Sequence, residues 1–433
     1  MKIYIENDPL FYPEIKYIFS IFCANKGIQY GLVDSKSDAD FIISDHEYSD
    51  IRISREFYQK LQEGKFDFKY HFTTECHIKD SSGIIDYLSS AFYILGCIQE
   101  INNKSEDEFG RFKYSDSFQN KFGNVKDNIV QTIFDELFNL NDKLNVNQQP
   151  KYKSRIFLSH DIDTIYGSIL QDSLFNIKKL RPDLVLKVML FNLFSNPTWL
   201  NIDRIMKIES EYNFYSTFFW LVNRGKVSDI LSNSDYDINN KQVRFHINKI
   251  HQSKWENGLH KSATNDAFST EIKKLDIDIK GNRYHYLKFK PHTDFQKIDE
   301  AGLLFDSSLG FADESGFRNG YGQPYHPYNM EERRPYKFVE CPLNIMDTTF
   351  FNYKKASASE FVDFVISFCE KNNFNNTISV LFHNNYISDY KFKTYGEAFK
   401  RILSYFYDSG LKCITQTEII NQFKNEYSNK IDE

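Results

Sequence analysis

The sequence has little cysteine and no long apolar run, and both absences narrow the possible classes of protein. Only six cysteines occur in 433 residues. They are scattered and form no CxxC pair, so they predict reduced thiols rather than a disulfide framework or a zinc finger. No segment reaches the roughly 18 consecutive apolar residues of a membrane span. The first residues carry one lysine followed by Glu6 and Asp8, unlike a secretory signal. We therefore expect a soluble, cytoplasmic protein.

An excess of positive charge is also missing. Lys and Arg total 53 against 59 Asp and Glu, which gives a formal net charge of −6. Nucleic-acid binders need a clustered basic face, so we do not expect nucleic acid as a partner. Hydrophobic residues at 41% and aromatics at 17% are enough for a large core. At about 150 residues per domain, the length predicts two or three domains.

The pattern along the chain predicts a small N-terminal unit and a larger second one. A short strand is expected over residues 2–5, and apolar spacing predicts helices over 84–98 and 128–138. A polar segment over 139–153 precedes a buried strand that begins at Arg155. We therefore predict a smaller α/β domain at 1–148 and a second domain at 149–433.

In the second domain, strand-like and helical segments alternate, which predicts an α/β fold with a parallel sheet or barrel. A long helical segment over 165–200, interrupted by two prolines, is expected as an insertion. The strand-like runs lie at 216–222, 285–289, 337–341 and 378–382.

The first candidate site follows the strand that begins at Arg155. Asp161 and Asp163 stand two residues apart at its end, where side chains of parallel α/β folds enter the site. One carboxylate could bind a metal while the other takes a proton from water. The same residues are also common turn formers and helix caps, and both interpretations stay open from this segment alone.

Further strand-like segments carry histidines. His260 follows Gly258, His285 follows Arg283, and the run over 378–382 is followed by His383. A histidine at the end of a buried strand suits general acid–base work near neutral pH. A single histidine is more often a hydrogen-bonded packing residue. Several such segments together favour a catalytic site.

These motifs, in this order, resemble the polysaccharide deacetylase (NodB-homology) family, carbohydrate esterase family four. Ser159-His-Asp-Ile-Asp163 is similar to its Thr-Phe-Asp-Asp-Gly motif, and Thr217-Phe-Phe219 to the Thr-Phe-Phe of its second strand. The remaining matches are His260 for the first histidine of His-Ser/Thr-x-x-His, Arg283 for the Arg of Arg-x-Pro, and Leu381-Phe-His383 for Leu-x-His. Residues 86–112 resemble an N-terminal domain found in one bacterial subgroup.

The resemblance implies an irregular (β/α) barrel of polysaccharide-deacetylase type, beside the smaller N-terminal α/β domain. It implies Asp161 as general base, His383 as general acid, and Arg283 as the residue that orients or tunes Asp161. Asp163 and His260 would be metal ligands. The implied cofactor is a divalent metal, zinc as first choice, with cobalt or nickel as alternatives.

One departure from the family pattern concerns the metal. The second histidine ligand should stand four residues after His260, where this sequence has Thr264. Zinc sites normally use three protein ligands, and our hypothesis is that His285 supplies the third. His160 is a poorer substitute, because on a strand it points away from the side of Asp161. The alternative is that His285 packs in the barrel and the site is metal-free or inactive.

Four further polar residues are candidates for other roles near the site. Asp306 is a candidate substrate contact or a helix cap. Arg318 is a candidate for gripping an anionic group on a sugar, or for a structural salt bridge. Glu340 and Asp347, on either side of Pro342, could line the same face.

The sequence thus predicts a hydrolase that removes an N-acetyl or related acyl group from a sugar in bacterial surface-polysaccharide biosynthesis. The expected partner is an acetylated sugar or glycan. Two rivals stay open: a non-catalytic carbohydrate-binding relative without the metal, and a hydrolase of a non-sugar amide or O-acyl ester. The oligomeric state is left open.

Overall fold

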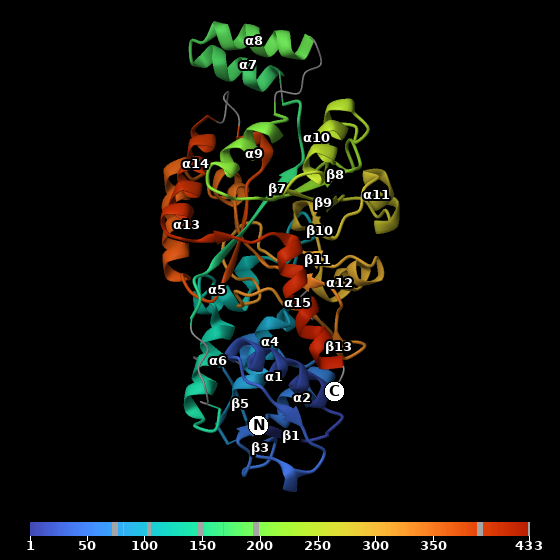
Figure 1. Cartoon of the computed structure of the whole chain (residues 1–433), viewed down its shortest axis with the longest axis vertical. Helices are drawn as coiled ribbons and strands as arrows, with labels where there is room; N and C mark the ends of the chain where they lie inside the picture. Colours follow the sequence, from blue (N-terminus) through green and yellow to red (C-terminus); the bar gives the residue numbers. More distant parts are fainter. Residues whose placement is uncertain are drawn as a thin grey trace.

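The structure is a computed structural model, and it describes residues 1–71, 77–80, 82–101, 105–144, 151–167, 169–193, 199–387 and 393–431. Along the long axis of the molecule, the N-terminal part lies at one end, a barrel in the middle and a helical hairpin at the other end (Figure 1). The predicted boundary at 148/149 lies within 145–150, outside the described residues, and stays a prediction. None of the described helices combines the length and the hydropathy that a bilayer span requires.

The N-terminal part has a parallel four-stranded sheet with the order β2-β1-β3-β4. The predicted strand at 2–5 is confirmed. The sheet consists of β1 (Lys2–Ile5), β2 (Gly31–Leu32), β3 (Phe41–Ser44) and β4 (Ile51–Arg52). A two-stranded antiparallel pair, β5 (Ile78–Lys79) and β6 (Ile85–Asp86), lies beside it.

The helices of this part include both predicted ones. The segment over 84–98 contributes α4 after a short strand, and the segment over 128–138 contributes α6. The helices are α1 (Tyr12–Lys26), α2 (Arg55–Gln62), α3 (Phe68–His71), α4 (Tyr87–Leu95), α5 (Phe118–Phe122) and α6 (Ile129–Leu140). The 3-10 turns are η1 (Lys36–Asp38), η2 (Ile98–Glu100) and η3 (Tyr114–Asp116).

From residue 155 onward, the described chain forms a nine-stranded parallel sheet. Its order is β14-β11-β10-β9-β8-β7-β16-β15, and β17 also pairs with β7. The strands are β7 (Arg155–Ile162), β8 (Thr217–Leu221), β9 (Glu256–Lys261), β10 (Gly281–Tyr284), β11 (Phe305–Asp306), β14 (Val339–Glu340), β15 (Leu343–Met346), β16 (Thr377–Leu381) and β17 (Lys412–Cys413). Nearly every residue of β7, β8 and β16 is buried, as expected for a parallel sheet covered on both faces.

The two edge strands of this sheet are neighbours in the sequence. Only Cys341 and Pro342 separate β14 from β15, so the sheet must curl until its edges meet. The α/β fold class is thus confirmed: an irregular (β/α) barrel with a smaller N-terminal α/β unit. A short hairpin of β12 (Tyr328–Asn329) and β13 (Arg334–Pro335) lies outside the barrel sheet.

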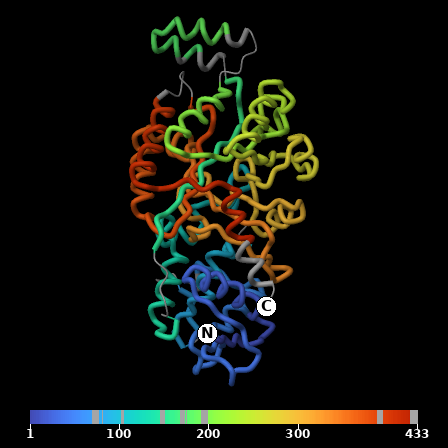
Figure 2. The backbone as a smooth tube through the Cα atoms, in the orientation of Figure 1, coloured from blue at the N-terminus to red at the C-terminus, as the bar shows by residue number. Residues whose placement is uncertain are grey.

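The helices of the second part surround the barrel, as the tube in Figure 2 shows. They are α9 (Ile202–Ser210), α10 (Lys241–His251), α11 (Phe268–Leu275), α12 (Pro291–Glu300), α13 (Ala358–Lys371), α14 (Lys393–Asp408) and α15 (Gln416–Ile431). Short turns occur at η4 (His285–Leu287), η5 (Thr349–Tyr353) and η6 (Asn384–Tyr386). The predicted insertion contains α7 (Ile169–Lys178) and α8 (Pro182–Leu193), which stand beyond the barrel (Figure 1).

One strand prediction is wrong. The run over 285–289 is not a strand, because β10 ends at Tyr284 and the chain turns at once into η4. Tyr286 and Leu287 have left-handed backbone angles, with φ of 60° and 53°. The local pattern suggested a strand, but strand preferences reflect packing surfaces rather than the backbone itself.

Candidate active site

The carboxyl ends of four barrel strands bring the predicted acid–base and metal residues together. Asp161 lies near the end of β7 and Asp163 follows it, while His260 lies on β9. Arg283 lies on β10 and His285 directly follows that strand. His383 follows β16 at a distance of two residues. Because parallel strands all end on one side of the sheet, these side chains converge there.

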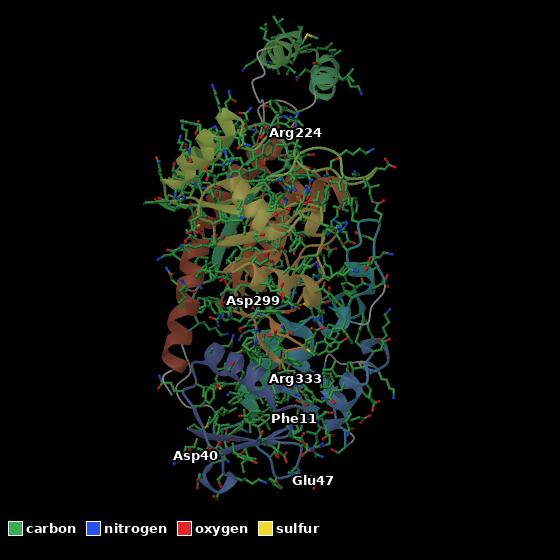
Figure 3. All side chains as sticks on the ribbon, turned by 90° about the vertical axis from the view of Figure 1, so that its right-hand side faces the viewer. Phe11, Asp40, Glu47, Arg224, Asp299 and Arg333 are labelled. Atoms are coloured by element: carbon green, nitrogen blue, oxygen red, sulfur yellow. The ribbon has the colours of Figure 1, made fainter. Side chains whose placement is uncertain are left out.

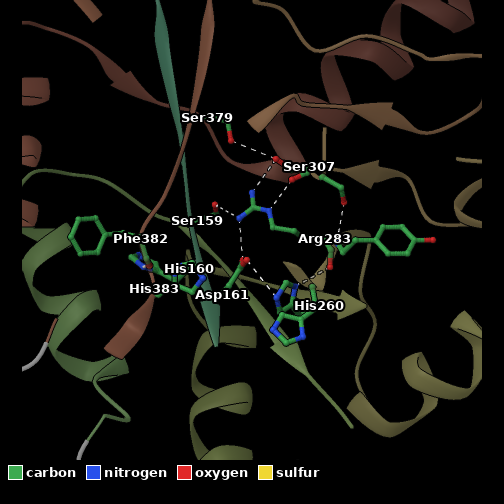
Figure 4. A network of polar contacts seen from close by, with 12 residues as sticks. Ser159, His160, Asp161, His260, Arg283, Ser307, Ser379, Phe382 and His383 are labelled. Carbon is green, nitrogen blue, oxygen red and sulfur yellow. Dashed lines mark hydrogen bonds and ion pairs between the residues drawn. The ribbon is translucent and has the colours of Figure 1, made fainter. Parts of the chain in front are cut away.

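Asp161 is held by a buried arginine (Figure 4). Arg283 Nη1 lies 3.1 Å from Asp161 Oδ1 and donates to Ser159 Oγ at 2.8 Å. On its other side, Nε and Nη2 donate to the backbone and hydroxyl oxygens of Ser307 at 2.8 and 3.0 Å. Every nitrogen of the guanidinium is thus engaged, which fixes the position of the Asp161 carboxylate.

Packing against a ring also fixes Arg283. The guanidinium lies 4.7 Å from the centroid of the Phe219 ring on β8. That ring needs the glycine on the next strand, because a Cβ at Gly258 would lie 2.5 Å from Phe219. The Gly258 that the sequence showed before His260 therefore makes room for the ring beneath the arginine.

Asp163, His260 and His285 form a group that could hold a metal ion. His260 Nε2 lies 3.2 Å from Asp163 Oδ1, and His285 Nε2 lies 3.7 Å from Asp163 Oδ2. Ligand atoms bound tetrahedrally at about 2.0–2.1 Å from zinc lie roughly 3.3 Å from one another. The separations in this group are therefore close to those of a shared ion.

The hydrogen bonds of the group also fit a metal. The Nδ1 of His260 lies 2.9 Å from the carbonyl oxygen of Arg283, and donation there leaves Nε2 free to act as a ligand, as is usual in metal sites. The buried His260 Nε2 and Asp163 Oδ1 have no partner in hydrogen-bonding geometry among the described residues. Buried polar atoms without a hydrogen bond that face one point fit a cation bound between them.

The charge states of the group affect how it would bind a metal. Burial would raise the pKa of Asp163, but the adjacent His285 and His260 rings hold it well below its usual range. Burial lowers the pKa of His285. Burial would also lower the pKa of His260, but Asp161 and Asp163 raise it. A metal therefore competes with a proton at His260, so its affinity should fall at low pH.

The described residues contain one other group of this kind, at the N-terminal sheet. It consists of Glu6, Asp45 and His46. Arg55 already pairs with Asp45, with Nε 2.5 Å from Oδ2. Because an arginine compensates this charge, the Asp163 group is the stronger candidate for a metal site.

His383 is held by a carboxylate that comes from the neighbouring strand. Its Nδ1 lies 2.6 Å from Asp347 Oδ1, and its backbone N–H donates to Asp347 Oδ2 at 2.6 Å. Its Nε2 lies 3.6 Å from Asp163 Oδ2. Burial would lower the pKa of His383, but the charge of Asp347 and its hydrogen bond raise it to about 9. His383 can therefore carry a proton at neutral pH.

His160, the other candidate for the third ligand, and Thr264, which stands where the family has its second histidine, lie away from this group. His160 points outward from β7, where its ring nitrogens lie 2.5 Å from Phe382 O and 2.7 Å from Glu209 Oε1. The Thr264 hydroxyl contacts Ser262 and Asn223 instead. Of the two candidates for the third ligand, His285 and His160, only His285 stands beside Asp163.

The two predicted substrate contacts do not line the pocket around Asp163. Asp306 is buried and accepts hydrogen bonds from Asn282 and Ser308. Burial raises the pKa values of both Asp306 and its neighbour Glu340. The Arg318 guanidinium forms an ion pair with Glu100, at 2.6 Å, and only 1% of the residue is exposed. Of the two alternatives predicted for Arg318, anion binding and a structural salt bridge, the structure therefore shows the salt bridge.

The pocket around Asp163 has a volume of about 340 Å³, within the range of small-molecule sites. Two of its lining residues, Phe109 and Arg111, come from the N-terminal part. The full set is Phe109, Arg111, Asp161, Asp163, Thr164, His260, His285, Tyr286, Leu287, Met346, Thr348, Asn352, Tyr353, His383, Asn385 and Tyr386.

Some residues that build this site are only weakly indicated by the sequence. Asp347 follows the buried strand β15 as Asp163 follows β7, and that signal was available. Ser307 and Phe109 carried no signal of this kind, because their roles depend on contacts between distant segments.

Comparisons with known proteins give limited matches. Residues 1–145 match the model of a family of unknown function, DUF7033. No curated protein matches the chain. Among solved structures, a candidate polysaccharide deacetylase from Mycobacterium smegmatis matches at 12% identity, over 65% of this chain and 94% of its own, with a TM-score of 0.42. The polysaccharide deacetylase Bc1974 from Bacillus cereus matches at 11% identity, over 61% and 94%, with a TM-score of 0.33.

A third match is BA3943 from Bacillus anthracis, a pseudoenzyme of the CE4 family. It is 10% identical, covers 62% of this chain and 66% of its own, and has a TM-score of 0.32. Similarity at this level says nothing about activity, so the function of this chain has to follow from its own side chains.

Proposed function

We propose that the protein is a metal-dependent hydrolase that removes an N-acetyl or related acyl group from a sugar. The observation that carries the proposal is a single pocket with three parts. It contains a carboxylate held by an arginine, Asp161 with Arg283, and an imidazole held by a carboxylate, His383 with Asp347. The Asp163 group with metal-site spacing lies in the same pocket.

The metal ligands in this proposal are Asp163, His260 and His285. When bound, a divalent metal supplies Lewis-acid polarisation of the acyl oxygen and lowers the pKa of a water. Zinc suits one carboxylate and two imidazoles, and cobalt and nickel are the alternatives to test.

Asp161 acts as general base on the attacking water. Its Oδ1 is tied to Arg283 at 3.1 Å, while its Oδ2 faces His260 Nε2 at 3.5 Å. The arginine fixes the direction of the carboxylate, so the second oxygen is available for the proton. Base assistance of this kind contributes about 10²–10⁴-fold to a rate.

His383 acts as general acid on the leaving amine. Its Nδ1 is engaged by Asp347, so Nε2 is the atom that faces the pocket. An amine is a poor leaving group unless it is protonated as the C–N bond breaks. A histidine with a raised pKa carries that proton at neutral pH.

The test is acetate release by the zinc-loaded protein from N-acetylated sugars and glycans, with O-acetyl esters and short non-sugar amides alongside. We expect release from the N-acetylated sugars. In Asp161→Asn, turnover should fall by about 10²–10⁴-fold while sugar binding persists. Turnover only of the other amides or esters would replace the substrate class. Sugar binding without turnover of any compound would favour the non-catalytic carbohydrate-binding alternative.

The surface-polysaccharide context and the cytoplasmic location stay predictions. Isolating the native glycan on which the protein acts would test the first, and cell fractionation would test the second.

A further inference from the structure

We infer that the loop of residues 105–112 (the 105–112 loop), within the N-terminal region that matches a family of unknown function, is a working part of the active site. In this assignment Arg111 is a positioning residue for the segment that carries His285, and Phe109 forms part of the substrate-binding wall. The inference rests on the proposed function and gives the N-terminal region a role in it.

The 105–112 loop is a tight turn that holds its own shape. Glu106 and Phe112 form an antiparallel bridge across it. Between them, Asp107 Oδ1 accepts hydrogen bonds from the backbone N–H groups of Phe109 and Arg111, both at 2.9 Å. Gly110 has a φ of +79°, which a residue with a side chain rarely adopts. The loop therefore presents Phe109 and Arg111 in one defined arrangement.

Arg111 connects the loop to the barrel at two points beside the metal group. Its Nη1 donates to the carbonyl oxygen of Tyr286 at 2.9 Å, and its Nη2 donates to the Tyr353 hydroxyl at 2.9 Å. Its Nε is taken by Asp107 at 2.7 Å. Because each guanidinium nitrogen already has a partner, Arg111 acts through the barrel residues rather than on a substrate.

The Tyr286 carbonyl is at a strained part of the backbone. Tyr286 and Leu287 both lie in the left-handed region, which is unfavourable for a residue with a side chain. They directly follow His285, the residue proposed as third metal ligand. A hydrogen bond from Arg111 to the first strained residue favours the conformation that points His285 at Asp163.

Phe109 forms a wall with the same tyrosine. Its ring stacks on the Tyr286 ring, with centroids 5.5 Å apart and planes 18° apart, and both residues line the pocket around Asp163. The Arg111 guanidinium lies 4.6 Å from the Phe109 ring centroid. The aromatic surface that would face a sugar ring is thus built jointly by the N-terminal region and the barrel.

A second arginine offers a matched control. Arg333 also joins the barrel part to the N-terminal region, through Glu14 and the carbonyl oxygens of Pro9 and Leu10. It does not line the pocket around Asp163, and Figure 3 shows it close to Phe11. Arg333→Met should loosen the attachment of the N-terminal region without touching the segment after His285.

The experiment compares Arg111→Met and Arg333→Met in the full-length protein. Backbone hydrogen exchange of the metal-free proteins comes first. We expect residues 285–289 to exchange about tenfold faster in Arg111→Met, the effect of losing one hydrogen bond from a charged donor, and to be unchanged in Arg333→Met. Zinc affinity, measured by competition with a chelator, should then fall about tenfold or more in Arg111→Met alone.

Each outcome has a distinct meaning. Equal exchange at 285–289 in wild type and Arg111→Met overturns the positioning role, whatever the zinc affinities of the two proteins. Faster exchange with unchanged zinc affinity also overturns the positioning role, because the conformation of residues 285–289 would then have no effect on metal binding. Equal losses in both variants would assign the effect to general attachment of the N-terminal region. A wild type that binds no zinc contradicts the proposed function, while the exchange result still decides whether Arg111 holds the segment.

The role of Phe109 in substrate binding is tested separately. Phe109→Ala should raise KM for the acetylated sugar more than it lowers kcat, and it should leave zinc affinity near the wild-type value. A fall in kcat with unchanged KM would overturn the substrate-contact role.

Discussion

Arg283 Nη1 lies 3.1 Å from Asp161 Oδ1, and the two side chains are almost fully buried. A buried charge pair is costly to break by removing one partner, since the other charge is left without compensation. This pair therefore matters to stability as well as to the proposed catalysis.

The first prediction is that Arg283→Met lowers the free energy of unfolding by about 3–5 kcal/mol. Urea denaturation at pH 7 measures it. The double variant Asp161→Asn, Arg283→Met should recover part of the loss, because no unpaired charge remains. Arg181→Met, at the exposed Arg181–Asp183 pair, is the control and should leave stability unchanged. An equal loss in the single and double variants would mean that packing, not charge, explains the effect.

The second prediction concerns the pH dependence of catalysis. In the wild type, Asp347 raises the pKa of His383 to about 9, so the general acid stays protonated at neutral pH and loses its proton as pH rises. In Asp347→Asn that pKa falls, and the alkaline limb of the kcat profile should move to lower pH. Steady-state rates across the pH range measure the limb. An unmoved limb would mean that another group donates the proton.

The strand ends were the predictable part of this site. Buried runs followed by Asp or His showed where Asp161, Asp163, His260 and His383 would lie, because the carboxyl ends of parallel strands meet at one edge. The direction of His160 also followed from the two-residue alternation of a strand.

Long-range partners were not predictable. Arg318 is a candidate anion binder in the sequence, but its partner Glu100 is 218 residues away. Likewise, nothing local to Tyr286 indicates that Arg111, 175 residues earlier, donates to its carbonyl. Local patterns in the sequence do not show contacts between distant segments. For the same reason they predicted a strand at 285–289, where the structure has none.

A third prediction concerns the buried carboxyl pair of Asp306 and Glu340. Burial and the neighbouring Asp306 raise the pKa of Glu340 well above its usual range. The folded protein therefore binds a proton there that the unfolded chain releases above its ordinary pKa. The stability that this proton provides is complete at low pH and is lost as pH rises through the raised value.

Glu340→Gln supplies a permanent neutral donor in place of the protonated acid. Its stability should fall less than that of the wild type as pH rises above about 4.5, the usual range of glutamate. Denaturant unfolding across this pH range, with the exposed Glu211→Gln as control, measures the difference. Parallel stability curves for wild type and Glu340→Gln would contradict a protonated Glu340.

The central claim is that Asp163, His260 and His285 hold a divalent metal, and the metal content of the purified protein tests it most directly. Elemental analysis after dialysis would compare the wild type with His285→Ala and with His251→Ala, an exposed histidine at the end of α10. We predict about one equivalent in the wild type and in His251→Ala, and a clear loss in His285→Ala. Undiminished metal in His285→Ala, or none in the wild type after zinc or cobalt is added, would contradict the claim.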